Sequence, residues 1–150
     1  MDITIITVGK LKEVYLKDAI EYYSKSIKKT NSLNIIEVPD EKTPDNASER
    51  EELKIKEREG EAILKNVKDN AFVFALAIEG KLLTTEALNK YINDLKFKDT
   101  KEVVFIIGGS LGLSARVLKR ADYKLSFSKM TFPHQLMRVI LLEQLNKVLV

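Results

Sequence analysis

The residue types that could do chemistry gather in two stretches of the C-terminal half of the chain. Ser126–Arg138 combines hydroxyl, amide and basic side chains with the only histidine of the sequence. Gly108–Gly112 (Gly-Gly-Ser-Leu-Gly) directly follows an apolar run that predicts a strand. Glycine permits positive φ and lets the backbone approach a flat ligand closely. We therefore expect the two stretches to form one ligand site. A polar connecting loop and a tight strand-to-helix turn are the plainer alternatives.

The composition of these stretches indicates a neutral or zwitterionic ligand. Ser126–Thr131 offers hydroxyls and backbone amides but only one charged side chain, which suits an adenosine derivative better than a polyphosphate. The G-x-G-x-x-G motif of dinucleotide-binding proteins is missing after the first predicted strand, and the chain has no G-x-x-x-x-G-K-[ST] motif. With one histidine and no cysteine, only scattered carboxylates remain as metal ligands. We therefore expect no metal site.

Three side chains of the first stretch could act on a substrate. His134 stands at the start of the last predicted helix, where the helix dipole disfavours its charged form. A surface or capping role is the alternative for this residue. Lys129 and Arg138 could contact phosphate, and the alternative is that both are simply solvated.

The rest of the chain alternates between strand and helix patterns. Strands are predicted at Asp2–Val8, Leu33–Val38, Ala71–Ile78, Glu102–Ile107 and Tyr123–Phe127. Helices are predicted at Leu11–Lys29, Ser48–Lys65, Glu86–Leu95, Ser114–Ala121 and from Pro133 onward. This alternation predicts an α/β fold with a mostly parallel sheet and helices on both faces. Ligands of such sheets bind beyond the carboxyl ends of the strands, and both chemistry-bearing stretches follow strand ends.

Two of the predicted helices have unusual composition. Glu49–Glu59 is almost entirely charged, which predicts a solvated helix face, with an RNA-contact face as the alternative. The last helix is apolar nearly all round, and a helix buried on one side needs only an apolar stripe. We therefore expect a second subunit against the last helix, and hence a homodimer.

The bulk properties are those of one globular domain, residues 1–150. The formal charge of +3 is compatible with an RNA partner without requiring one. No apolar run approaches the roughly 20 residues needed to span a bilayer, so no membrane partner is expected. The N-terminal residues do not resemble a signal peptide, and a cytoplasmic protein is expected.

Four segments spread along the chain match a known pattern in order and spacing. They are Ile5–Lys12 (Ile-x-x-Val-Gly-Lys-Leu-Lys), Glu37–Glu41, Ile106–Gly112 and, most specifically, Ser126–Gln135. Together they closely resemble the RlmH (YbeA-like) family, which are SPOUT-class methyltransferases. The resemblance covers essentially the whole chain.

The resemblance implies an activity and a fold. Members of this family transfer a methyl group from S-adenosylmethionine to N3 of a pseudouridine in 23S rRNA, on the assembled ribosome. Their α/β domain carries a C-terminal trefoil knot, a rare exception to unknotted connections. They are homodimers with the active site between the subunits.

The resemblance also implies site residues. Carried over residue by residue, the cofactor pocket falls on Leu76, Gly108, Phe127, Ser128, Lys129, Met130, Thr131 and Phe132. Arg138 is expected to contact the target base or a phosphate. His134 is a candidate proton acceptor, but the sequence leaves the general base unassigned. RNA affinity is expected to come partly from lysines such as Lys10, Lys12 and Lys129 and to weaken with salt.

The sequence departs from the family pattern after Gln144. Family members usually continue with an aromatic-basic stretch and a tail ending near Tyr-His-Lys, whereas this sequence ends Asn-Lys-Val-Leu-Val at Val150. In the family the tail helps to close the site and to meet the RNA. The alternative function is therefore a dimeric module that binds the cofactor or ribosomes with weak or no turnover.

Overall fold

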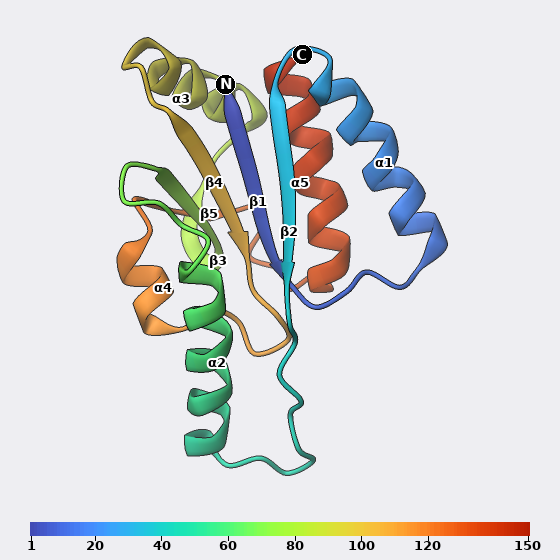
Figure 1. Cartoon of the computed structure of the whole chain (residues 1–150), viewed down its shortest axis with the longest axis vertical. Coiled ribbons are helices and arrows are strands. Elements are labelled where there is room, and N and C mark those ends of the chain that lie inside the picture. Colours follow the sequence, from blue (N-terminus) through green and yellow to red (C-terminus); the bar gives the residue numbers. More distant parts are fainter.

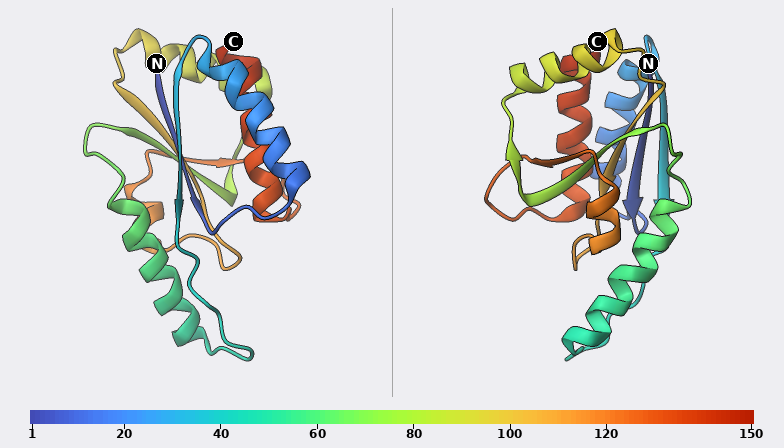
Figure 2. Two further views of the ribbon diagram at one scale, coloured as in Figure 1. Left: turned by 45° about the vertical axis from the view of Figure 1, so that its right-hand side comes forward. Right: turned by 90° about the vertical axis from the view of Figure 1, so that its left-hand side faces the viewer.

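The five predicted strands form one fully parallel sheet in the computed structural model, which describes all of residues 1–150. The strand order is β2-β1-β4-β3-β5, as Figures 1 and 2 show. The strands are β1 (Asp2–Val8), β2 (Ser32–Val38), β3 (Phe72–Leu82), β4 (Glu102–Ile107) and β5 (Tyr123–Ser126). The helices are α1 (Val14–Lys28), α2 (Glu49–Leu64), α3 (Thr85–Phe97), α4 (Ala115–Arg120) and α5 (His134–Leu149).

The helices cover both faces of the sheet, which confirms the predicted α/β class. α1, α3 and α5 share the larger apolar cluster, whereas α2 and α4 contribute to the smaller one on the other face. The central strands β1 and β4 are therefore buried on both sides. This burial explains their nearly continuous Ile, Val and Phe content. The trefoil knot that the resemblance implies stays a prediction.

The helix starts follow the capping residues of the sequence. Ser48, Thr84 and Ser114 each accept a hydrogen bond from the backbone N–H three residues later. These bonds satisfy amides that the first helical turn leaves free. The boundaries differ slightly at α1, which begins at Val14 instead of Leu11, and at β5, which ends at Ser126 instead of Phe127.

β3 differs most from its prediction, because it runs to Leu82 instead of Ile78. Its pairing with β5 breaks between Leu76 and Lys81, which both pair with Leu125. The four residues between them leave the regular ladder. A Cβ added at Gly80 would lie 2.6 Å from the carbonyl oxygen of Lys124, so only glycine fits there.

α5 packs within the chain against α1, α3 and β4. Its contacts with α1 include a hydrogen bond from the Tyr23 hydroxyl to Glu143, and the Thr85 hydroxyl at the start of α3 donates to Gln144. Much of the apolar circumference that the sequence assigned to a second subunit is therefore covered by the chain itself. No helix has the length and apolar character needed to cross a membrane.

Candidate active site

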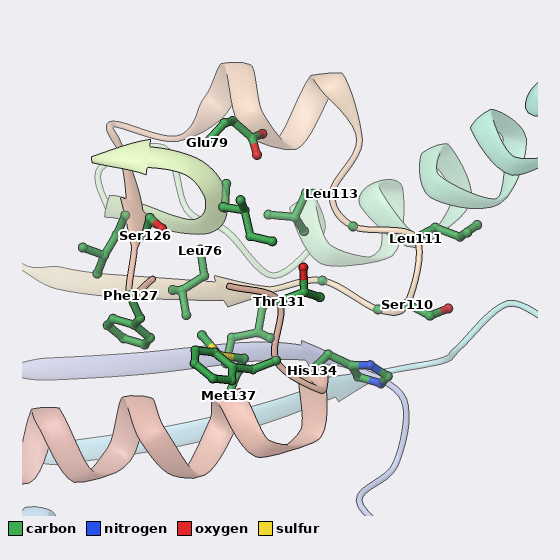
Figure 3. A pocket seen from close by; sticks show the side chains of 18 of the residues that line it. Leu76, Glu79, Ser110, Leu111, Leu113, Ser126, Phe127, Thr131, His134 and Met137 are labelled. Carbon is green, nitrogen blue, oxygen red and sulfur yellow. The ribbon is translucent and has the colours of Figure 1, made fainter. Parts of the chain in front are cut away.

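Three segments at the carboxyl edge of the sheet line a cavity of about 780 Å³, seen from close by in Figure 3. One is Leu76–Glu79 within β3, the second is the glycine turn after β4, and the third is the loop that joins β5 to α5. The volume is typical of pockets for small molecules and cofactors. Gly108–Gly112 and most of Ser126–His134 line this one cavity, as the sequence predicted. That the cavity binds a ligand stays a prediction.

Most of the predicted site residues line this cavity. They are Leu76, Gly108, Phe127, Ser128, Met130, Thr131, Phe132 and His134. Two predicted residues, Lys129 and Arg138, do not line it. Lys129 is exposed to solvent. The sequence prediction had missed two charged lining residues, Lys56 of α2 and Glu79 of β3.

The glycine turn is held in shape by its own backbone. The N–H of Gly112 donates to the carbonyl oxygen of Gly109 at 3.1 Å, and Gly112 has a φ of +86°. A Cβ at Gly108 would lie 2.9 Å from the carbonyl carbon of Gly112. Both positions therefore need glycine for the turn itself. The glycine stretch is therefore a tight turn that also forms part of the pocket wall.

The β5–α5 loop leaves backbone groups available to a ligand. The Ser126 hydroxyl donates to the carbonyl oxygen of Ser128 at 2.9 Å, and the Ser128 hydroxyl accepts from the N–H of Met130 at 3.0 Å. The backbone N–H and C=O groups of Thr131 and Phe132 make no hydrogen bond within the chain. Free amides and carbonyls beside apolar side chains fit the edge and faces of a purine.

His134 is the only histidine and lies half-buried at the first position of α5. Burial and the nearby positive charge of Arg138 lower the pKa of its imidazole, while Asp40 opposes the shift. The imidazole is therefore neutral at neutral pH and can accept a proton or a hydrogen bond.

Arg138 is turned away from the cavity and is 3% exposed. Its Nη1 donates to Oε2 of Glu37 at 2.6 Å, and its Nη2 donates to the carbonyl oxygens of Val8 at 2.9 Å and Gly9 at 2.8 Å. The same Glu37 oxygen accepts from the N–H of Leu11 at 2.9 Å. Arg138 therefore ties the start of α5 to the ends of β1 and β2.

Comparison with known proteins agrees with this geometry. A family model described as "Predicted SPOUT methyltransferase" matches residues 1–149. The chain belongs to the SPOUT methyltransferase family. The relatives named "Ribosomal RNA large subunit methyltransferase H" include one from Clostridium tetani (strain Massachusetts / E88), which is 64% identical over 147 residues. Others come from Bifidobacterium adolescentis, at 63% identity, and Clostridium novyi (strain NT), at 61%. Each alignment covers 98% of this chain and 92% of the relative.

One further residue of this SPOUT methyltransferase lies beside the pocket and was missed by the sequence prediction. Glu59 falls in the charged stretch that was expected to be solvated, yet it is 4% exposed. Its Oε2 accepts from the N–H of Glu41 at 3.1 Å, and its Oε1 lies 3.4 Å from where a Cβ on Gly109 would stand. The available signal was its spacing: Glu59 is four residues from both Ile55 and Ile63, which are buried on the same helix stripe.

The surroundings of Glu59 favour the protonated, uncharged form of its carboxyl group. The pKa of this carboxyl group is raised from 4.5 to about 7. Burial is the largest cause, the N–H of Glu41 acts in the opposite direction, and a hydrogen bond with Asp40 adds to the rise. Two carboxyl groups that share a hydrogen bond need a proton between them. The SPOUT methyltransferase has no group of three or more His, Cys, Asp or Glu side chains that could hold a metal ion.

Proposed function

We propose that this chain transfers a methyl group from S-adenosylmethionine to N3 of a pseudouridine in 23S rRNA of the assembled ribosome. Its membership of a methyltransferase family and the name shared by its relatives support the reaction and the rRNA substrate. The observation that carries the proposal is the cavity at the carboxyl edge, because the predicted cofactor residues other than Lys129 line it together from three separate segments.

The lining fits the proposed methyl donor in size and chemistry. The adenine would lie among Leu76, Phe127 and Phe132 and meet the free backbone groups of the β5–α5 loop. Gly108 would let the backbone approach the ligand closely. Lys129 belongs to this proposed set through its backbone, since its side chain points to solvent.

The chain's own contribution to the reaction is alignment and removal of a proton. Bound S-adenosylmethionine supplies an electrophilic methyl group. N3 of the target base carries a weakly acidic proton, which must leave as the new N–C bond forms. His134 lies in the cavity wall with a lowered pKa and is the proposed acceptor of that proton. Alignment of two reactants is the larger contribution, worth about 7–11 kcal/mol.

Arg138 is proposed to position His134. The two residues lie one helical turn apart at the start of α5, and the buried contacts of Arg138 hold that turn against Val8, Gly9 and Glu37. A direct contact between Arg138 and the target base stays a prediction. It would require the guanidinium to leave these three partners.

The proposed assembly is a cytoplasmic homodimer. Support for it comes from α1 and α5, which lie side by side in Figure 1. Val14, Tyr15 and Tyr22 of α1 are about 70% exposed, and Leu136 in the first turn of α5 is 36% exposed. Large apolar side chains gathered on neighbouring helices are typical of a subunit interface.

Two measurements test the function separately. Calorimetric titration with S-adenosylmethionine tests the pocket, and absence of binding at millimolar ligand would contradict the assignment. Methyl transfer to ribosomes that carry pseudouridine tests the reaction, with ribosomes that carry uridine at that position and free rRNA as controls. Binding of the donor without transfer would indicate the alternative, a cofactor- or ribosome-binding module without turnover.

A further inference from the structure

Phe97 is the most exposed large apolar side chain of the molecule. It ends α3, and 94% of it is accessible to solvent. One exposed apolar side chain is ordinary in a soluble protein. Phe97, however, stands between Lys96 and Lys98, which are both exposed as well. The chain thus presents a bare aromatic ring with a lysine on either side in the sequence.

More lysines lie on the same edge of the sheet. The turns α1–β2 and α3–β4 lie with the N-terminus at one end of the molecule, the upper end in Figures 1 and 2. Thr30 and Asn31 of the first turn line a shallow hollow of about 810 Å³ together with Lys96 and Lys101 of the second. Lys28 and Lys29 directly precede the first turn and are exposed.

This edge carries an excess of free positive charge. We call the surface formed by Lys28, Lys29, Lys96, Phe97, Lys98 and Lys101 the amino-edge surface. None of its lysines forms an ion pair. The acidic side chains nearest in the sequence or lining the hollow are Asp2, Asp94, Asp99 and Glu102, so five lysines face four carboxylates.

We propose that the amino-edge surface binds an unpaired segment of RNA. One base stacks on Phe97, and the lysines contact the phosphates on either side. Aromatic rings within a positively charged surface are how proteins hold single strands, because every base has a π-face and every linkage a charge. A duplex would hide its base faces from Phe97. An acidic protein would use the lysines and leave the ring without a function.

The surface is separate from the cavity. β4 begins at Glu102, next to Lys101, and ends at Ile107, next to Gly108 of the pocket. Six residues of strand span about 20 Å at roughly 3.3 Å per residue. The RNA footprint therefore extends well beyond the target nucleotide. The choice of partner rests on the proposed rRNA function.

The test compares variants for binding to a labelled oligouridylate of about 12 nucleotides, within the usual site size of single-strand binders. Phe97→Ala is expected to weaken binding by about 5- to 150-fold, which is the range for loss of one stacked base, while Phe97→Tyr keeps it near that of the unmodified chain. The double variant Lys96→Gln/Lys98→Gln is expected to make the slope of log K against log salt shallower by about 1.4. Lys65→Gln/Lys68→Gln removes the same charge from the end of α2 and serves as the control.

Several results would overturn the proposal. One is an equal affinity of Phe97→Ala and Phe97→Tyr for the oligouridylate. Another is an equal change in the salt dependence of binding for Lys65→Gln/Lys68→Gln and Lys96→Gln/Lys98→Gln. A change in sedimentation with Phe97→Ala would show a subunit contact instead. Unchanged oligonucleotide binding with lost ribosome binding would point to a protein partner. Methyl transfer by the unmodified chain is measured in the same experiment. If oligonucleotide binding is intact but no methyl group is transferred, the proposed reaction is refuted and the proposed RNA-binding surface is retained.

Discussion

Replacing Glu59 by glutamine should remove a pH-dependent part of the chain's stability. Glu59 is buried beside Asp40, and its carboxyl group has a pKa of about 7 in the folded chain against an ordinary value of 4.5. Glutamine has the same shape and cannot ionise. Its oxygen can still accept from the N–H of Glu41, and its NH₂ group can donate to Asp40, so the contacts of the folded state are retained.

The sign of the effect follows from proton binding. Between pH 4.5 and about 7 the folded chain holds a proton on Glu59 that the unfolded chain has released. The free energy of unfolding therefore falls as the pH rises through this window. Moving one pKa from 4.5 to about 7 corresponds to about 3 kcal/mol at 1.36 kcal/mol per pKa unit. Charged Glu59 thus costs the folded chain about 3 kcal/mol above the window.

Urea denaturation at pH 4.5 and pH 8 measures this contribution. The change in unfolding free energy between the two pH values is taken for the unmodified chain and for Glu59→Gln, so that the other titrating groups cancel. The unmodified chain is expected to lose about 3 kcal/mol more than the variant. Glu61→Gln, an exposed neighbour on α2, should behave like the unmodified chain. Equal losses for the unmodified chain and Glu59→Gln would refute the reasoning, because Glu59 would then be charged in the folded state.

Three further predictions concern the pocket and its frame. Arg138→Met should lower the unfolding free energy by about 3–5 kcal/mol, because it leaves the Glu37 carboxylate and two carbonyl oxygens without their partner. Exposed Arg116→Met is the control and should change the unfolding free energy by less than about 0.5 kcal/mol. Similar losses for the two variants in urea denaturation would count against a stabilising role of the Arg138 contacts. Gly108→Val should weaken S-adenosylmethionine binding by about 5- to 150-fold in calorimetry, since overpacking costs roughly 1–3 kcal/mol; unchanged affinity would argue against the placement. Tyr15→Asp with Tyr22→Asp should convert a sedimenting dimer to monomer, and a persistent dimer would place the interface elsewhere.

The strands and the pocket loops were predictable because local pattern decides them. β1 and β4 are apolar, β-branched runs closed by glycine, and such runs lie in the middle of parallel sheets. Ser48 and Ser114 indicate helix starts, because their side chains can accept a hydrogen bond from the first helical turn. A parallel sheet then brings the ends of β4 and β5 to one edge, which places Gly108 opposite the β5–α5 loop.

Buried charge was not predictable, because it depends on partners far away in the sequence. Arg138 pairs with Glu37, which lies 101 positions earlier. Glu59 bonds to Glu41, which is 18 positions earlier. Isolated charged residues are almost never buried, so solvent exposure is the correct expectation until the partner is known. The irregular end of β3 was hidden for the same reason, since only its pairing with β5 reveals the four residues that leave the ladder.

The Arg138 contacts explain why separate segments of the chain share the family pattern. Val8 and Gly9, Glu37, and the helix start at His134–Arg138 all belong to matching or adjoining segments, and one guanidinium joins them. None of Val8, Gly9, Glu37 and Arg138 lines the cavity. These residues therefore act on the cavity indirectly, by setting where α5 begins and hence where His134 and the preceding loop stand. A substitution at Glu37 should then disturb methyl-donor binding from outside the pocket, as loss of a positioning contact does.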